Sequence, residues 1–226
     1  MYIHRTAENE FYSLCNNFKV ILVSGMRQVG KSTLLQKLVT EERNYVNLDN
    51  SEDYELASNA PSAFFRQHQL PLIIDEIQRV PQLFRQVKAE VDKSDACGQV
   101  WISGSQRFSL MQNVGDSLAG RIFEVHLMPL SIYEREGKGL MQSNYIPSED
   151  LKNHLDPRST SETWDVIWQG AWPKLTNMNS KGRSQFLESF IQTFLERDIR
   201  TLGNIEKLSE FKKFIKALAI RTGQEL

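Results

Sequence analysis

Residues Ile21 to Leu38 read ILVSGMRQVGKSTLLQKL, and this stretch decides the fold. It opens with aliphatic residues that show no polar alternation, which is typical of a strand buried on both faces. A loop bracketed by Gly25 and Gly30 follows, and three leucines then recur at helical spacing. The sequence therefore predicts a buried strand, a glycine-bracketed loop and a helix, in that order.

The loop satisfies the phosphate-binding pattern G-x-x-x-x-G-K-[ST] through Gly25, Gly30, Lys31 and Ser32. A helix N-terminus presents unpaired N–H groups and the positive end of the helix dipole, while glycines let the backbone close around phosphate oxygens. We expect Lys31 to neutralise the terminal phosphates and the Ser32 hydroxyl to bind Mg²⁺. A tight turn with an accidental lysine is the alternative. The residues predicted to contact the nucleotide are Gly25, Met26, Arg27, Gln28, Val29, Gly30, Lys31, Ser32 and Thr33.

A second buried strand, LPLIIDE, ends in the adjacent acids Asp75 and Glu76. Acids at the end of a buried strand are costly unless they serve a cation or a water molecule. Asp75 fits a residue that holds Mg²⁺, directly or through water, and Glu76 fits a general base that polarises the attacking water. This order favours hydrolysis over nucleotide storage. The alternative is an acid pair stabilised by the dipole of the next helix.

A third hydrophobic strand lies in GQVWISGSQ and runs into a small polar loop. In P-loop ATPases with a strand inserted between the two motif strands, a polar side chain at its end contacts the γ-phosphate or the attacking water. Ser105 or Ser103 could take this role, and Ser105 is our catalytic candidate. A plain turn built from serine and glycine is the alternative.

Strands that are apolar on both faces alternate with helices up to about residue 136. This order predicts an α/β fold, a parallel sheet with helices on both faces. Gly, Pro, Ser and Asn accumulate between residues 137 and 161, and the remainder reads as helical. We therefore predict an ATPase core at 1–136, a linker or irregular segment at 137–161 and a helical region at 162–226.

The 226-residue chain carries 27 Lys and Arg against 28 Asp and Glu, a formal net charge of -1. Bulk attraction to nucleic acid or to an anionic membrane is therefore absent. No run approaches the roughly 18 apolar residues of a membrane span, and the N-terminus has no apolar signal region, so we expect a cytoplasmic protein. Cys15 and Cys97 have no zinc-site spacing and are expected to be reduced.

Four stretches together resemble the prokaryotic predicted-ATPase family of the AAA+ superfamily, in which an AAA-type domain precedes a C-terminal domain of unknown function. They read GMRQVGKSTLL, LIIDEIQRVPQLFRQVKAEVD, ISGSQRFSLMQNVGDSLAGRIFEVHLMPLS and FLERDIR. The similarity covers nearly the whole chain. It implies ATP as the nucleotide and a five-stranded parallel sheet in which the sensor strand flanks the P-loop strand.

The resemblance also singles out Arg121, in LAGRIFEVHL, as a candidate trans-acting arginine finger. Such a residue raises turnover in a neighbouring subunit by about 10³ to 10⁵, which would require a homo-oligomer. The alternative is a structural ion pair within its own subunit. A second sensor arginine is also usual in the superfamily, and the sequence does not rank Arg183, Arg197 and Arg200 for that role.

The helical region carries two apolar patterns. Trp164, Trp168 and Trp172 recur at i, i+4 and i+8, which predicts a core stripe, with an aromatic platform for nucleobases as the minor alternative. Near the C-terminus the pattern places four apolar residues inward (Phe211, Phe214, Ile215 and Leu218) and three lysines outward (Lys212, Lys213 and Lys216). Family members usually continue into a winged-helix-like module, so we expect a DNA-binding or effector part beyond Leu226.

Two functions compete. Lys31, Asp75 and Glu76 favour an ATP-hydrolysing machine that drives conformational change in a partner or assembly. The alternative is a nucleotide-dependent switch or DNA-binding regulator with little turnover, recognisable by salt-dependent binding through the lysine face. A small phosphotransferase shares the loop but needs a basic lid and an acceptor pocket, and the sequence shows neither clearly.

Overall fold

The computed structural model describes residues 2–39, 42–105, 118–141, 158–195, 208–222 and 224. The chain forms two compact units, Met1–Thr176 and Asn177–Leu226. The strands of the first unit are β1 (Val20–Ser24), β2 (Asn44–Asn47), β3 (Leu72–Asp75), β4 (Val100–Gly104) and β5 (Ile122–His126). Its described helices are α1 (Glu8–Asn17), α2 (Lys31–Leu38), α3 (Ser51–Asn59), α4 (Pro61–Gln67), α5 (Leu83–Val91), α7 (Ile132–Arg135) and α8 (Thr160–Gln169). Shorter 3-10 turns are η1 (Ile77–Arg79), η2 (Gly139–Met141) and η3 (Pro173–Asn177).

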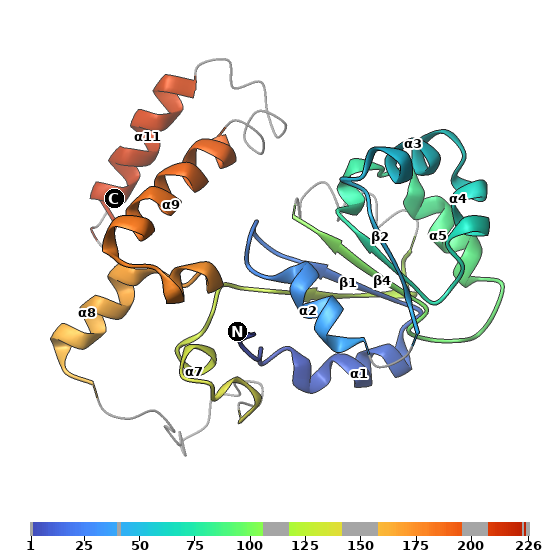
Figure 1. The fold of residues 1–226 in the computed structure, drawn as a ribbon, viewed down its shortest axis with the longest axis horizontal. Helices are drawn as coiled ribbons and strands as arrows, with labels where there is room; N and C mark the ends of the chain where they lie inside the picture. Colours follow the sequence, from blue (N-terminus) through green and yellow to red (C-terminus); the bar gives the residue numbers. More distant parts are fainter. Residues whose placement is uncertain are drawn as a thin grey trace. The chain divides into compact units, whose positions relative to one another are not determined.

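The five strands form one parallel sheet in the order β2-β3-β4-β1-β5 (Figure 1). This confirms the predicted α/β class and the five-stranded parallel sheet. Strand β4 lies between β1 and β3, so it is the inserted strand that the serine-containing segment predicted. Because all strands run the same way, the loop after β1 and the acids at the end of β3 reach the same edge of the sheet.

Helices cover both faces of the sheet, as the strands without polar alternation predicted. One core packs α1 and α2 against a sheet face, through Phe11, Leu34, Leu35 and Leu38 with Ile21, Val23, Ile73 and Trp101. The other packs α3, α4 and α5 against the opposite face, through Ala57, Phe64, Phe65, Leu83, Phe84, Val87 and Val91 with Leu22, Ile74 and Ile102. These two apolar layers hold the carboxyl edge of the sheet in place.

The predicted tryptophan stripe is wrong for two of its three members. The side chains of Trp164 and Trp168 are 65% and 85% exposed. Helix α8 ends at Gln169 and is capped by Gly170 with a φ of 74°, so Trp172 lies beyond the helix. A glycine in the left-handed region ends a helix readily, and the i+8 spacing therefore does not continue as one face.

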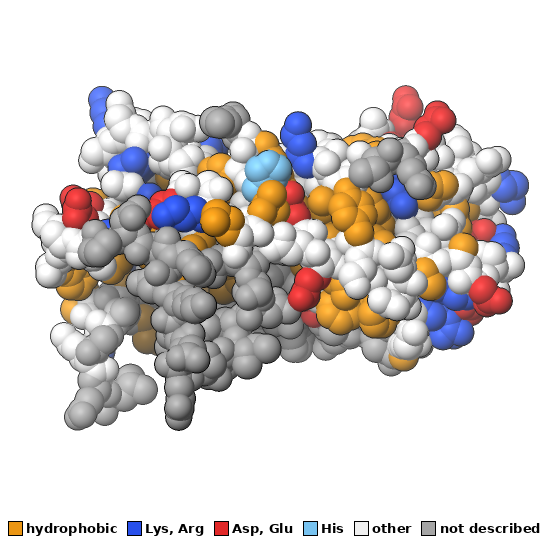
Figure 2. Space-filling model, turned by 90° about the horizontal axis from the view of Figure 1, so that it is seen from below, with side chains coloured by type: hydrophobic (Ala, Val, Ile, Leu, Met, Phe, Trp, Pro, Cys, Tyr) orange, Lys and Arg blue, Asp and Glu red, His pale blue; other side chains and the backbone are white. Residues whose placement is uncertain are grey.

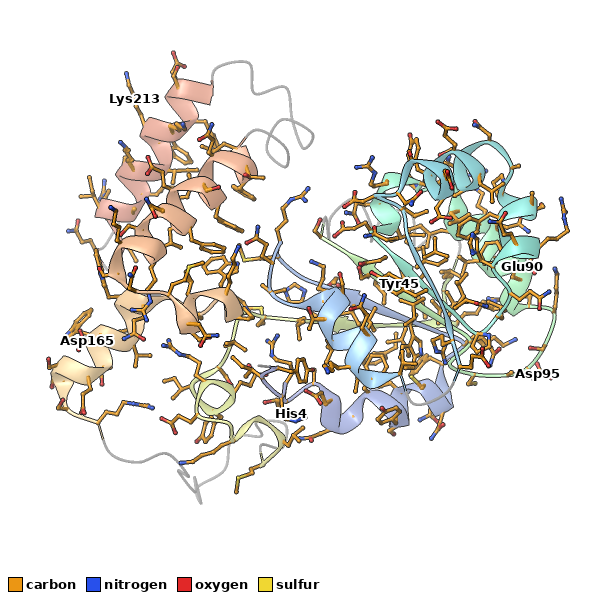
Figure 3. The ribbon with its side chains drawn as sticks, viewed as in Figure 1. His4, Tyr45, Glu90, Asp95, Asp165 and Lys213 are labelled. Carbon is orange, nitrogen blue, oxygen red and sulfur yellow. The ribbon has the colours of Figure 1, made fainter. Side chains whose placement is uncertain are left out.

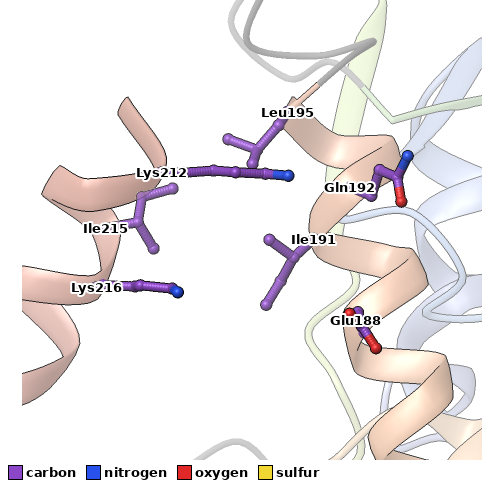
Figure 4. Close-up of a pocket in the computed structure, with 7 residues that line it drawn as sticks. All are labelled: Glu188, Ile191, Gln192, Leu195, Lys212, Ile215 and Lys216. Carbon is purple, nitrogen blue, oxygen red and sulfur yellow. The ribbon is translucent and has the colours of Figure 1, made fainter. Parts of the chain in front are cut away.

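The second unit contains α9 (Ser180–Thr193) and α11 (Leu208–Ile220). Between them lies a hollow of about 270 Å³, shown in Figure 4 and lined by Glu188, Ile191, Gln192, Leu195, Lys212, Ile215 and Lys216. The prediction that Phe214 and Leu218 face inward is wrong, since their side chains are 54% and 48% exposed. Two helices cannot cover all the apolar surface of one another.

Some predictions fall outside the described residues. These are Arg197 and Arg200, two of the three candidates for the second sensor arginine. The domain boundaries at 136 and 161 stay a prediction. None of the described helices is long and apolar enough to cross a membrane. On the face that Figure 2 shows, acidic and basic side chains are interspersed with hydrophobic ones.

Candidate active site

The glycine loop follows β1 directly. Its two motif glycines are required for different reasons, the first for lack of space and the second for its backbone conformation. Gly25 has a φ of 146°, and a Cβ atom there would lie only 2.3 Å from the Leu127 carbonyl oxygen. Gly30 has a φ of 98° and is the N-cap of α2. Gln28, with a φ of 61°, is a non-glycine residue in the left-handed region. Only glycine fits the first position, and left-handed residues at 28 and 30 curl the backbone around a concave surface.

The start of α2 supplies donors to this concave surface. The Leu34 N–H donates to the Gly30 carbonyl at 2.8 Å, which is the first bond of the helix. Helix geometry gives the N–H groups of a first turn no acceptor carbonyl in the same helix, and the first turn of α2 begins at Lys31. Lys31 is 5% exposed, and its ammonium donates to the Met26 carbonyl at 2.9 Å. The loop can therefore accept an anion through backbone N–H groups and one lysine.

Asp75 ends β3 and is 3% exposed. Its Oδ2 accepts a hydrogen bond of 2.7 Å from the Tyr45 hydroxyl, and its Oδ1 accepts one from the Ser103 hydroxyl. Tyr45 comes from β2, where Figure 3 labels it, and Ser103 comes from β4. Burial, followed by the hydrogen bond to Asp75, raises the pKa of Tyr45. Two neighbouring strands thus fix the orientation of this buried carboxylate.

Glu76 follows in a left-handed conformation, with a φ of 60°. A non-glycine residue in this region costs conformational energy and is often found at functional sites. Its N–H donates to the Ser103 hydroxyl at 3.4 Å. The side-chain amide of Gln78 donates both to the Glu76 carboxylate and, at 3.1 Å, to the Ser105 hydroxyl. Gln78 therefore joins the predicted general base to the predicted polar residue after β4.

The sheet brings most predicted site residues to one edge. Strand β4 separates β1 from β3, and at about 4.8 Å per strand the axes of β1 and β3 lie roughly 10 Å apart. The phosphate-binding loop follows β1. Asp75 ends β3 and Glu76 follows it, while Ser103 lies near the end of β4 and Ser105 follows that strand. A hydroxyl such as that of Ser32 and a carboxylate such as that of Asp75 are hard oxygen donors, which suit Mg²⁺.

Arg121 does not join this edge within its own chain. It precedes β5, and its carbonyl accepts from the N–H of Val20, the first residue of β1. Four steps of about 3.3 Å along β1 therefore separate it from the loop edge, roughly 13 Å. Its Nε lies 2.6 Å from Oδ1 of Asp92, and this hydrogen bond lowers the pKa of Asp92 and raises that of Arg121. Arg121 therefore forms the ion pair within its own subunit that the sequence offered as the alternative. Its action in trans stays a prediction.

Sequence reasoning missed Tyr45, Gln78, Arg5 and Trp172 as neighbours of the site. Gln78 could have been found, because it stands two residues after Glu76 in DEIQ. Tyr45 stands in no motif, and its role becomes visible only through its bond to Asp75. The spacing of the tryptophans places Trp172 in a hydrophobic stripe, whereas in the structure its indole N–H donates to the Arg27 carbonyl at 3.1 Å. Arg5 stands in no motif, and only the folded chain shows that it reaches the loop.

Comparison with known proteins agrees with this arrangement. Residues 17–136 match the family model of an AAA domain, and residues 160–226 match that of a domain of unknown function (DUF8612). Two uncharacterized proteins, from Mycobacterium bovis and Mycobacterium tuberculosis, are each 28% identical over 193 residues. The match covers 81% of this chain but 37% of each relative, so the chain spans little more than a third of their length. The AAA model covers more than half of the chain and coincides with the loop and the five-stranded sheet, and the chain therefore belongs to the AAA domain family of P-loop nucleotide-binding ATPases.

Proposed function

We propose that the chain binds ATP with Mg²⁺ and hydrolyses it, and that the cycle drives conformational change in a partner or assembly. One observation carries this proposal. The left-handed residues Gln28 and Gly30 shape an anion-binding loop at the edge of the sheet where β3 delivers Asp75 and Glu76. A loop that binds phosphate, next to a buried acid and a second acid beside it, is an arrangement suited to nucleotide hydrolysis.

The loop binds the phosphates in this proposal. Backbone N–H groups from Gln28 to Thr33 surround the phosphate oxygens, and Lys31 exchanges its bond with the Met26 carbonyl for a bond with the terminal phosphates. Ser32 and Asp75 would hold the Mg²⁺ ion, which neutralises phosphate charge when it is bound. The hydroxyls of Tyr45 and Ser103 keep the Asp75 carboxylate oriented before it binds.

Glu76 acts as the general base. Its carboxylate accepts the proton of the attacking water as the water forms its bond to the γ-phosphorus. Gln78 bonds both this carboxylate and the Ser105 hydroxyl, and it therefore fixes the position of the base relative to the end of β4. Ser105 is the residue we assign to the γ-phosphate or the attacking water.

Phosphate release from ATP by the full chain tests the proposal. Glu76→Gln removes the base but keeps the size of the side chain, so we expect ATP binding to persist while turnover falls by about 10² or more. Lys31→Ala should lose nucleotide binding. Glu90→Gln is the matched control, because Glu90 lies on α5 and bonds Gln86 and Lys93. Wild-type turnover in Glu76→Gln would overturn the proposal.

The exposed lysines of α11 favour the second candidate, a nucleotide-dependent regulator that binds DNA with little turnover. Lys212, Lys213 and Lys216 are all exposed on this helix. If they contact DNA phosphates, the logarithm of the affinity should fall linearly with the logarithm of the salt concentration. Replacing all three by alanine should then flatten this slope, and a binding constant that does not depend on salt rejects this candidate.

A further inference from the structure

Arg5 is a buried cation that contacts the backbone of the phosphate-binding loop at Val29. Its side chain is 3% exposed. Nη1 donates to the Val29 carbonyl at 2.9 Å, and Nη2 donates to the Met128 carbonyl, in the segment after β5, at 2.6 Å. Nε lies 3.1 Å from Oε1 of Glu134, which neutralises it. The guanidinium therefore links the loop to two other parts of the first unit.

Glu134 is itself held in one orientation. It is 5% exposed, and its Oε1 also accepts from the Thr6 N–H at 2.9 Å. Its Oε2 accepts from the Ser131 N–H at 2.7 Å, as part of the capping box that begins α7. A buried ion pair whose two members both make further hydrogen bonds is restricted in orientation. Arg5 therefore presents its donors to the loop at a fixed position.

Trp172 contacts the same loop from the segment after α8. Its indole N–H donates to the Arg27 carbonyl at 3.1 Å. The two residues that precede Trp172 are also held, because the Leu130 N–H donates to the Ala171 carbonyl at 2.8 Å and Arg135 donates to the Gly170 carbonyl at 3.0 Å. Unlike Trp164 and Trp168, Trp172 is thus engaged with the nucleotide-binding loop.

These two contacts determine where N–H groups of the loop point. In a planar trans peptide, the C=O of one residue and the N–H of the next point in opposite directions. With the Val29 carbonyl turned to Arg5, the Gly30 N–H points away from Arg5; with the Arg27 carbonyl turned to Trp172, the Gln28 N–H points away from the indole. Gln28 and Gly30 also have positive φ angles, of 61° and 98°.

We propose that Arg5 and Trp172 are positioning residues that hold the loop in its anion-binding conformation. The inference rests on the proposed binding of ATP at this loop. Both residues lie outside residues 17–136, which match the AAA domain, so segments on either side of that domain set its affinity for nucleotide. By linkage, phosphate binding at the loop stabilises the position of the Trp172 segment, which leads along the chain to the second unit at Asn177.

Trp172→Phe in the full chain tests the proposal, because it removes the indole N–H and keeps an aromatic ring. We expect the Kd for ATP to rise about 3- to 10-fold, as the loss of one hydrogen bond implies, with kcat at saturating ATP unchanged. Trp164→Phe and Trp168→Phe are matched controls, since both side chains are exposed, and they should bind ATP as the wild type does. Binding by Trp172→Phe that equals the wild type overturns the role of Trp172.

Fluorescence provides a readout that a purely structural role would not change. The chain has four tryptophans, and the Trp164→Phe/Trp168→Phe double variant retains only Trp101 and Trp172. ATP should change the emission of this variant, and the change should disappear when Trp172→Phe is added. An ATP response that persists without Trp172 contradicts the coupling.

Arg5→Lys extends the test to the other donor. Lysine keeps a positive charge for Glu134 but lacks the forked geometry that reaches two carbonyls. We expect the variant to fold, by circular dichroism, and to show a Kd for ATP at least 3-fold higher than the wild type, as the loss of a hydrogen bond implies. A folded variant with unchanged Kd overturns the role of Arg5. A wild-type chain that binds no ATP at all would instead reject the proposed function, and the two failures are therefore distinguishable.

Discussion

The Tyr45 hydroxyl donates a 2.7 Å hydrogen bond to Oδ2 of Asp75 and so ties the edge strand β2 to the acid at the end of β3. The two residues are 30 positions apart in the chain but lie on paired strands, where Asn47 is the register partner of Asp75. Because burial and the neighbouring carboxylate raise the pKa of Tyr45, its hydroxyl stays protonated as a donor through the neutral range. The orientation of the predicted Mg²⁺ ligand therefore depends on a second strand.

Tyr45→Phe removes this donor and keeps the ring. We expect the Mg²⁺ concentration for half-maximal ATP turnover to rise about 3- to 10-fold, because one hydrogen bond contributes roughly 0.5–1.5 kcal/mol. Titration of phosphate release with Mg²⁺ measures it. Tyr54→Phe is the control, since Tyr54 lies on α3 with its ring beneath Arg79. An unchanged Mg²⁺ requirement in Tyr45→Phe shows that Ser103 alone orients Asp75.

Gln78→Ala tests the link between Glu76 and the end of β4. Without the amide, the Glu76 carboxylate loses the contact that holds it near Ser105, and we expect kcat to fall several-fold while the Kd for ATP stays the same. Single-turnover hydrolysis and equilibrium ATP binding measure the two quantities. Gln86→Ala on α5, whose side chain bonds Glu90, should change neither. A parallel change in Kd would place Gln78 in nucleotide binding instead.

Arg121 and Asp92 allow the two roles of the arginine to be separated. If the arginine acts in trans, Arg121→Ala should lower turnover by about 10³ or more in the assembled state, and Asp92→Ala should not. If it serves only its ion pair with Asp92, both variants should keep turnover and lose the same small amount of stability. Phosphate release measured against protein concentration, with and without a non-hydrolysable ATP analogue, distinguishes these outcomes.

Cys15 yields a prediction about pH. Burial raises the pKa of its thiol to about 11, although Cys15 and Cys97 line the same hollow of about 190 Å³. The folded state favours the neutral thiol over the thiolate. The contribution of Cys15 to the free energy of unfolding is therefore fully present below the unfolded pKa near 9.0, and it is lost as the pH rises towards 11, because the unfolded chain ionises first. In a Cys97→Ser variant, alkylation by iodoacetamide should follow a titration centred near pH 11 in the native protein. A midpoint near 9 in the native state would contradict it.

The contiguous stretch from Ile21 to Leu38 determined the strand, loop and helix by itself, because periodicity and glycine positions act over neighbouring residues. The same holds for the strand that ends in Asp75 and Glu76. The alternation of buried strands and helices predicted a parallel sheet. In such a sheet the glycine loop and the acid pair lie at the same edge, because both follow the carboxyl ends of strands. Family, fold and candidate loop all follow from such local patterns.

Only the tertiary structure decided which side chains support these motifs. Arg5 and Glu134 are 129 positions apart, and Trp172 is 145 positions from Arg27, so no local pattern relates them. One expectation was wrong for a local reason, since α8 is capped at Gly170 before the tryptophan spacing can form one face. Pairing of β1 with β5 places Arg121 at the edge opposite to the loop of its own chain, and its action in trans stays a prediction. Contacts between distant segments depend on how whole helices and strands pack against one another. Patterns among neighbouring residues in one sequence do not specify that packing.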